Sequence, residues 1–313
     1  MKQKSKRLSL LILLVIPILL ILAIVTSTSG VVAAADVAQA GNTSNDSFSK
    51  SKKLLHKAIY KDPTSRQDIY CGCQYNEQKQ VDFTSCGYTP QKDNKRVHRI
   101  EWEYVVPAEA FGQSFPEWRN GHPDCVDNRG RSFKGRKCAE GVNPEYRLMQ
   151  ADMYNLYPAV GEVNGLHSNY SMAMIPGGQY RFGQCRTKIE DRKIEPRSEV
   201  RGEIARTYMY MDSAYPGRGI ISNKNEKLFR AWDKTDPVNE WECERAHRIA
   251  PGFKEILTRL SIRRVGHCRN RHHHGPTGIV ETDRDPTGIF WGEDLWPTVS
   301  IGPLSTLNGK IPK

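Results

Sequence analysis

Residues 99–108 read RIEWEYVVPA, and this segment is the most informative part of the chain. Side chains in a strand point alternately to its two faces. Glu103 is either a functional carboxylate or, if the segment is a strand, an ordinary carboxylate on the surface of that strand. His98 precedes Tyr104 by six residues, which in an extended strand separates the two by about 20 Å. We therefore do not expect His98 to act at the position of Tyr104.

Two helices are predicted further along the chain. The first spans residues 144–157, where apolar side chains recur at helical spacing, a proline suits the first turn and a second proline ends the pattern. Asn155 lies near its end, where it either caps the helix or serves a functional site. The second helix spans residues 201–211 and presents one apolar face to the core, formed by Ile204, Tyr208 and Met211.

These segments resemble the bacterial endonuclease I family of periplasmic or secreted nucleases, and residues 99–108 resemble the active-site strand of that family. The likeness extends from about residue 69 to residue 249, and includes CGC (71–73), PAVGEVNG (158–165), RGEIARTY (201–208) and PVNEWECER (237–245). The resemblance implies an α+β protein, with a mixed α/β endonuclease I-like fold that contains a ββα-metal motif and is stabilised by disulfides. It also implies that one face of the protein binds duplex DNA.

The same resemblance implies a catalytic metal site. Glu103 matches the family's glutamate ligand, and Asn155, within DMYNL (152–156), matches the asparagine that supplies the other protein ligand. Two oxygen ligands leave a hard ion such as Mg²⁺ with several waters, which this ion prefers when it also holds a phosphate. The expected cofactor is therefore Mg²⁺ or another divalent cation.

Two positions depart from the family pattern. The family has EHVVPA where this chain has EYVVPA, so Tyr104 stands at the position of the general-base histidine. A phenol, with a pKa near 10, is a poor base at neutral pH, and losing a general base costs about two to four decades of rate. His167 stands where the family usually has an arginine. We keep it as a candidate phosphate contact, although an imidazole cannot form the two parallel hydrogen bonds that an arginine guanidinium makes to a phosphate.

The N-terminus reads as an export signal. Lys2, Lys4, Lys6 and Arg7 precede an apolar run over residues 8–25, and small residues follow it. Cleavage is expected near residue 35 or residue 40, which gives a secreted or periplasmic protein. The run is also close to the length that spans a bilayer, so a membrane anchor through residues 8–25 is the alternative.

The eight cysteines agree with export, because disulfides persist in oxidising compartments. They allow 105 pairings, and the sequence alone does not choose among them. Cys125 and Cys138 would close a short basic loop. A zinc site is the weaker alternative, since no paired two-residue spacing of cysteines occurs.

The net charge of +11 is compatible with an anionic partner, and local clustering is more informative than the total. Five basic side chains with two glycines between them lie within nine residues, namely Arg129, Arg131, Lys134, Arg136 and Lys137. Such a loop suits phosphate contact, although a basic loop can also serve solubility alone.

The chain divides into a signal or anchor (1–35), a flexible leader (36–53), a nuclease domain (54–250) and a tail (251–313). The likeness to the family stops after residue 249, where the family continues with a KIQGNxNPF-type segment. The codons of residues 251–263 can be inferred from the amino acids, and moving their reading frame back by one base yields RIQGNPNPFIHK. We therefore interpret the tail as an out-of-frame, disordered segment. The histidine run at 272–274 is then not an evolved metal site.

Three functions remain compatible with the sequence. The favoured one is an exported, monomeric, metal-dependent nuclease that hydrolyses phosphodiester bonds in DNA, with RNA as an alternative substrate and with activity reduced by Tyr104. A nucleic-acid-binding protein without catalysis would keep the basic loop and lose turnover. A decaying gene product would neither fold nor accumulate.

Overall fold

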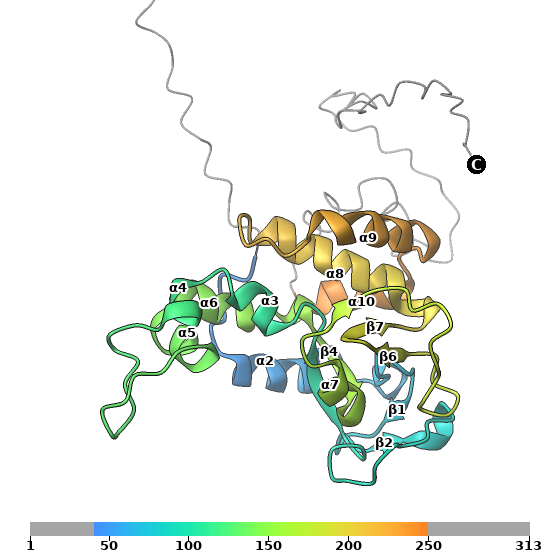
Figure 1. Cartoon of the computed structure of the whole chain (residues 1–313). Helices are drawn as coiled ribbons and strands as arrows, with labels where there is room; N and C mark the ends of the chain where they lie inside the picture. The colour runs from blue at the N-terminus through green and yellow to red at the C-terminus, as the bar shows by residue number, and fades with distance from the viewer. Residues whose placement is uncertain (1–40, 250–313) are drawn as a thin grey trace, which may run out of the picture. The chain divides into compact units, whose positions relative to one another are not determined.

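The computed structural model describes residues 41–249, and this part of the chain has the predicted α+β architecture (Figure 1). Its helices are α2 (Phe48–Leu54), α3 (Ala108–Gly112), α4 (Pro116–Asn120), α5 (Arg136–Val142), α6 (Pro144–Gln150), α7 (Gly161–His167), α8 (Arg201–Ala214), α9 (Asn223–Thr235) and α10 (Glu240–Ile249). Its strands are β1 (Gln74–Tyr75), β2 (Val81–Asp82), β3 (Ile100–Tyr104), β4 (Leu156–Val160), β5 (Ser171–Met172), β6 (Lys188–Glu190) and β7 (Lys193–Glu195). The strands form small separate sheets, β1-β2, β3-β4 and β5-β7-β6.

None of the helices within residues 41–249 is long and apolar enough to cross a membrane. The predicted signal or anchor and the predicted tail lie outside the described residues.

The antiparallel pair β3-β4 is the structural centre of the ββα unit. Glu103 lies opposite Tyr157, and Tyr104 lies opposite Leu156. Helix α7 follows β4 directly and packs against both strands. This order of strand, strand and helix is the ββα arrangement that the family resemblance implied.

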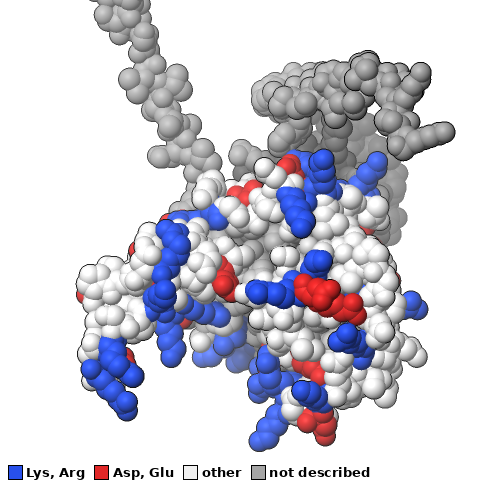
Figure 2. All heavy atoms as spheres, viewed as in Figure 1, with Lys and Arg blue, Asp and Glu red and all other residues white. Residues whose placement is uncertain are grey.

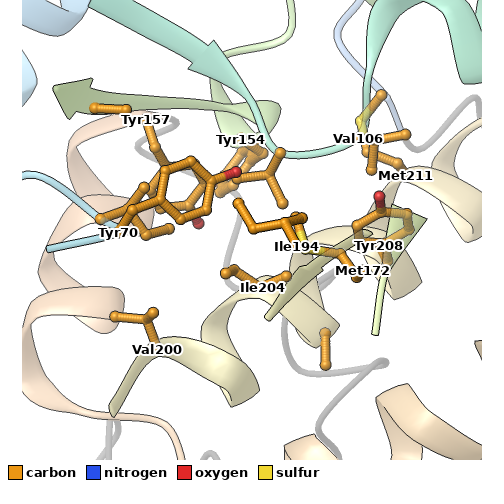
Figure 3. Close-up of a cluster of buried hydrophobic side chains, with 14 of the residues drawn as sticks. Tyr70, Val106, Tyr154, Tyr157, Met172, Ile194, Val200, Ile204, Tyr208 and Met211 are labelled. Carbon is orange, nitrogen blue, oxygen red and sulfur yellow. The ribbon is translucent and has the colours of Figure 1, made fainter. Parts of the chain in front are cut away.

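The two faces of β3-β4 contact different hydrophobic clusters, because successive side chains alternate between the faces. The face that carries Tyr157 joins the larger cluster, which includes Ile194, Ile204 and Tyr208 (Figure 3). The other face buries Trp102 and a smaller group formed by Leu55, Ile59, Tyr60, Tyr75, Ile100 and Leu156. Glu103 and Tyr104, as neighbours in β3, therefore belong to opposite faces.

The first predicted helix is shorter than expected. Helix α6 ends at Gln150, and Met153–Asn155 form a separate 3₁₀ turn before β4. The Asp152 side chain accepts the backbone N–H of Tyr154, which caps the new turn. The predicted helix was too long because Leu156 fits the helical spacing of apolar residues. In the structure Leu156 belongs to strand β4, and its buried side chain packs from that strand.

The expectation of a flexible leader is wrong for residues 41–53. Ser47 caps α2 through the backbone N–H of Lys50. The Ser51 hydroxyl is buried and donates to the carbonyl of Ala151 at 2.5 Å, and the Asn42 amide donates to the carbonyl of Leu148 at 2.8 Å. The polar composition that suggested disorder instead supplies hydrogen bonds to the domain.

The second predicted helix is confirmed and is longer than its predicted extent, as α8 reaches Ala214. Its predicted core residues Ile204, Tyr208 and Met211 are all buried, and Tyr208 stacks on Phe229 of α9 at a centroid distance of 4.3 Å. Helix α10 joins α8 through ion pairs in which the Arg206 guanidinium donates to Glu242.

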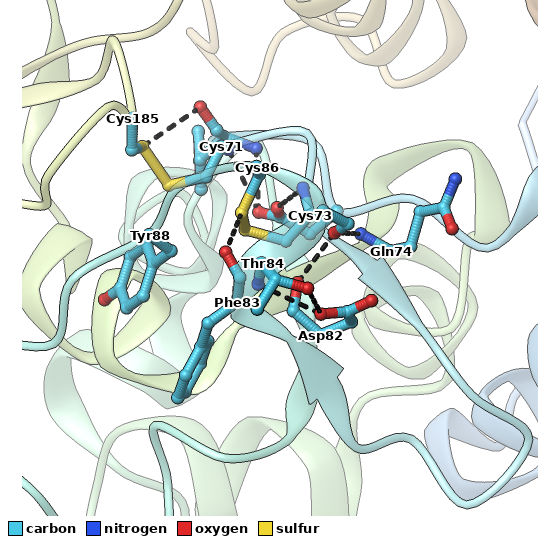
Figure 4. Close-up of a disulfide and its surroundings, with 12 residues drawn as sticks. Cys71, Cys73, Gln74, Asp82, Phe83, Thr84, Cys86, Tyr88 and Cys185 are labelled. Carbon is cyan, nitrogen blue, oxygen red and sulfur yellow. Dashed lines mark hydrogen bonds between the residues drawn. A yellow bond between two sulfur atoms is a disulfide. The ribbon is translucent and has the colours of Figure 1, made fainter.

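The described cysteines confirm a disulfide-stabilised domain. The bonds are Cys71–Cys185, Cys73–Cys86 and Cys125–Cys138, and the described residues contain no free cysteine. The first two bonds lie next to each other (Figure 4). The first is also the longest-range of the three, with a sequence separation of 114 residues, and it joins the turn around residue 71 to the segment before β6.

Candidate active site

Glu103 lies at the centre of a buried polar group on the ββα unit. It comes from β3, and the residue is only 3% exposed. The Tyr70 hydroxyl donates to its Oε1 atom at 3.0 Å, and Nδ1 of His167 contacts the same oxygen. His167, the last residue of α7, is completely buried. A surface role for Glu103 is therefore excluded.

The turn around residue 70 positions the tyrosine in this group. The buried Asp68 carboxylate accepts the backbone N–H groups of Tyr70, Cys71 and Cys73. Gly72 has φ +75°, a left-handed conformation that glycine adopts without steric cost. The tight turn and the Cys71–Cys185 bond together hold Tyr70 against Glu103.

Asn155 is buried and fixed by the backbone of Val106. Its Oδ1 atom accepts the Val106 N–H at 2.7 Å, and its Nδ2 atom donates to the Val106 carbonyl at 2.9 Å. This pair of bonds sets the orientation of the amide and joins the end of β3 to the start of β4. One lone pair of Oδ1 remains for another partner.

The Tyr104 phenol is engaged on the opposite face of β3. Its hydroxyl donates to the carbonyl of Gln150 at 2.9 Å and accepts from the Arg136 guanidinium at 2.8 Å. Phe48 of α2 stacks on its ring at 5.1 Å. Burial raises the pKa of the Tyr104 phenol far above its usual value, and the nearby Arg136 charge only partly opposes this. As arranged here, Tyr104 is a hydrogen-bond donor and a very poor base.

The oxygens of Glu103 and Asn155 are hard donors of the kind that suits Mg²⁺ or a similar ion. A buried carboxylate is costly without polar or charged partners, and Glu103 has the Tyr70 hydroxyl and the His167 imidazole beside it. Within residues 41–249, no cluster of three or more His, Cys, Asp or Glu side chains is arranged to hold a metal.

The predicted basic loop is a disulfide-closed hairpin between α4 and α5. Val126 and Ser132 form a β-bridge, and the Cys125–Cys138 bond closes the base. The loop extends away from the neighbouring helices (Figure 1), and Lys and Arg side chains gather on it in the view of Figure 2.

The five basic residues do not form one group. Arg129, Lys134 and Lys137 are exposed. Arg131 is also exposed and pairs with Asp127 at 2.7 Å. Arg136 is half-buried, and its guanidinium lies over the rings of Tyr104 and Phe48. The hairpin therefore offers exposed cations, whereas Arg136 belongs with Tyr104.

The other predicted histidines have separate locations. His98 is exposed and bonds Asp93 at 2.6 Å. His167 is buried beside Glu103, so it lies with the carboxylate and not among the exposed cations. The histidine run at 272–274 lies outside the described residues.

Tyr70 and Phe48 carry no sequence signal that points to the site. Tyr70 is 33 residues from Glu103 along the chain, and no spacing links the two. Phe48 lies in a segment whose polar composition concealed its helix. The aspartate, glycine and cysteines around Tyr70 indicate a tight turn, but not what that turn approaches.

Comparison with known proteins agrees with this geometry. Residues 37–254 match the sequence profile of the family described as Endonuclease I. An extracellular deoxyribonuclease of Aeromonas hydrophila is 39% identical over 208 residues, which cover 64% of this chain and 83% of that protein. A periplasmic deoxyribonuclease of the same species is 39% identical with 64% and 80% covered. Endonuclease-1 of Buchnera aphidicola subsp. Acyrthosiphon pisum is 38% identical over 202 residues, with 63% and 74% covered.

The matched region contains the whole ββα unit, the Glu103 group and the three disulfides, so sequence and structure lead to the same assignment. The chain belongs to the endonuclease I family.

Proposed function

We propose that this protein is an exported, metal-dependent deoxyribonuclease that hydrolyses phosphodiester bonds, acts as a monomer and has activity reduced by Tyr104. Its disulfides and the extracellular and periplasmic relatives support export. DNA is the proposed substrate because the relatives are named deoxyribonucleases, and RNA is the alternative to be tested.

The observation that carries the proposal is the burial of the Glu103 carboxylate on a ββα unit. A strand-surface carboxylate would be solvated, as Glu101 on the same strand partly is, with Arg96 and Arg99 as its ion partners. Within residues 41–249, the carboxylate of Glu103 forms its hydrogen bonds with Tyr70 and His167 and no ion pair with an arginine. An anion kept in this environment is suited to binding a cation.

In this mechanism, Glu103 and Asn155 would hold a divalent ion, with Mg²⁺ as the first choice. When bound, the ion lowers the pKa of a water and stabilises charge on the phosphate. The backbone of Val106 fixes the Asn155 oxygen, and Tyr70 orients the Glu103 carboxylate. The cations of the hairpin contact neighbouring phosphates and keep the duplex in register.

Tyr104 limits the rate because it cannot take a proton from the attacking water. Its hydroxyl already accepts from Arg136 and donates to Gln150, and burial opposes its ionisation by raising its pKa. The remaining activity would then depend on the ion and on solvent as the proton acceptor.

Plasmid nicking by the purified chain, with Mg²⁺ and then with a chelator, tests the proposal. Glu103→Gln should abolish metal-dependent nicking, whereas Glu101→Gln, two residues away on the same strand, should leave most of it. Asn155→Ala should also abolish nicking, and its melting temperature must be recorded because it loses both bonds to Val106. Equal nicking by the Glu103 and Glu101 variants would refute the assigned ligand.

The alternative is a protein that binds DNA without cutting it, and the engaged phenol of Tyr104 favours it. Duplex binding without any metal-dependent nicking would establish this alternative. Binding through the hairpin should weaken as the salt concentration rises. Replacing both Arg129 and Lys134 by Ala should reduce the slope of the logarithm of the binding constant against the logarithm of the salt concentration by about two. Lys227→Ala, an exposed change on α9, is the matched control.

A further inference from the structure

Helix α2 and the π-helical turn that continues it, Leu55–Ile59, carry an exposed row of lysines. Lys50, Lys53 and Lys57 are all exposed. Their spacings of three and four residues place them along one side of a helix. With a rise of about 1.5 Å per residue, the row is about 10 Å long, which equals about three phosphate spacings along one strand of duplex DNA.

In the described part of the chain, no carboxylate forms an ion pair with this row of lysines. Residues 47–61 contain no Asp or Glu. The acidic residues that flank this segment pair with arginines. Asp46 pairs with Arg147 at 3.2 Å. Asp62 pairs with Arg248 at 2.6 Å. The row therefore retains positive charge that a polyanion can contact.

His56 of the same turn lies in positive surroundings. Burial lowers the pKa of its imidazole, and the charges of Lys79 and Arg66 lower it further. Each of these two charges has a larger effect on this pKa than Glu77, which acts in the opposite direction. The cations around the turn therefore outweigh the acidic side chain beside it.

The row begins where α2 meets the base of the hairpin. Phe48, the first residue of α2, stacks on the Tyr104 ring at 5.1 Å. The Lys52 ammonium lies 4.5 Å from the centroid of the Phe48 ring, and the Arg136 guanidinium lies 5.2 Å from it. Because Arg136 lies at the base of the hairpin, the lysine row and the hairpin cations border one another beside Tyr104. In Figure 2, Lys and Arg side chains gather both on the hairpin and in the region where Figure 1 places α2.

The apolar side of this segment faces the protein. Leu55 and Ile59 are buried in the smaller cluster, and Phe48 and Leu54 are half-buried. An amphipathic helix that binds a membrane needs an exposed apolar face, and no large apolar side chain of residues 48–59 is exposed. A partner that interacts through charge alone, such as a phosphate backbone, fits this surface better than a lipid bilayer does.

We propose that Lys50, Lys53 and Lys57 form a second phosphate-binding surface, so that duplex DNA lies along α2 as well as against the hairpin. Tyr104 lies where the two surfaces meet. The inference rests on the proposed function for the identity of its ligand. Lysines contact phosphates as point charges, so this surface adds affinity and orients the duplex without reading its sequence. Each lysine that neutralises a phosphate releases a counterion, which makes binding at this surface depend on salt.

Binding of a fluorescently labelled DNA duplex to the full chain, measured with a chelator present at several salt concentrations, tests this inference. Replacing Lys50, Lys53 and Lys57 by Ala should reduce the slope of the logarithm of the binding constant against the logarithm of the salt concentration by about three. Replacing the same three residues by Arg should retain the slope, because the charge is kept. The matched control is Lys224→Ala with Lys227→Ala, two exposed lysines with a three-residue spacing on α9, and it should leave the slope unchanged.

Acetylation of lysine amines, read by mass spectrometry, tests the same surface in the unaltered chain and so does not depend on how a variant folds. Bound duplex should slow the acetylation of Lys50, Lys53 and Lys57 severalfold. Acetylation of Lys224 and Lys227 should proceed at the same rate with and without duplex.

Two outcomes would overturn the inference. One is an unchanged slope in the triple Ala variant together with unchanged acetylation under bound duplex, and plasmid nicking by the unaltered chain would then leave the proposed function standing. The other is protection of the row by vesicles that contain phosphatidylglycerol but not by duplex, which would make it a membrane-binding surface. If the slope falls as expected and the unaltered chain nicks no plasmid with Mg²⁺, the inference stands and the proposed nuclease activity fails.

Discussion

Glu203 offers a quantitative test of the packing between α8 and α10. Its carboxyl is buried, and its pKa is raised from 4.5 to about 7, first by loss of hydration and then by the nearby Glu242. The charges of Arg245, Arg206 and Arg197 act in the opposite direction and do not compensate fully.

The stability consequence follows from proton linkage. Below pH 4.5 the carboxyl is protonated in both the folded and the unfolded chain, so it imposes no penalty. Between pH 4.5 and about pH 7 the unfolded chain releases the proton while the folded chain retains it, and the free energy of unfolding falls. A difference of about 2.5 pKa units corresponds to at most about 3 kcal/mol, present in full above pH 7.

Glu203→Gln replaces the protonated carboxyl by a neutral group of the same shape. At pH 5 the variant should be more stable by less than about 1 kcal/mol, and at pH 8.5 by about 3 kcal/mol. Chemical unfolding under oxidising conditions from pH 5 to pH 8.5 measures this difference. Glu226→Gln, in the exposed pair with Arg230, is the control and should change little. A stability difference that does not grow with pH would refute the reasoning.

Three further results are expected. Tyr104→His should raise Mg²⁺-dependent nicking at least tenfold by supplying a base, and an unchanged rate would exclude this position as the missing base. The same variant should melt lower by about 2–4 °C, measured by thermal unfolding, because the buried bond to the Gln150 carbonyl is lost. Replacing the chain after Ile249 by RIQGNPNPFIHK should raise the melting temperature and protease resistance, and a tail that is already protected from protease would contradict the frame-shift interpretation.

Local patterns in the sequence were sufficient to predict helix α8, because the helical spacing of Ile204, Tyr208 and Met211 acts locally. The likeness to the family supplied the α+β class, the strand around Glu103 and the ββα unit, which no local pattern contains.

The remaining features depend on contacts between distant segments. Leu156 fits a helical pattern, yet pairing with Tyr104 places it in a strand. Ser51 looks like a linker residue until the carbonyl of Ala151 is available to it. His167 could be identified as unusual at its position, but only the folded chain brings its ring to Glu103.

The bond between Cys71 and Cys185 determines in which kind of compartment the group around Glu103 becomes fully ordered. Tyr70 directly precedes Cys71, so the crosslink that closes a loop of more than a hundred residues also holds the hydroxyl that orients Glu103. Closing a loop of this length removes about 4–5 kcal/mol of chain entropy from the unfolded state. In a reducing cytoplasm the bond does not form. Full order at the Glu103 carboxylate therefore depends on an oxidising compartment, such as those of the extracellular and periplasmic relatives.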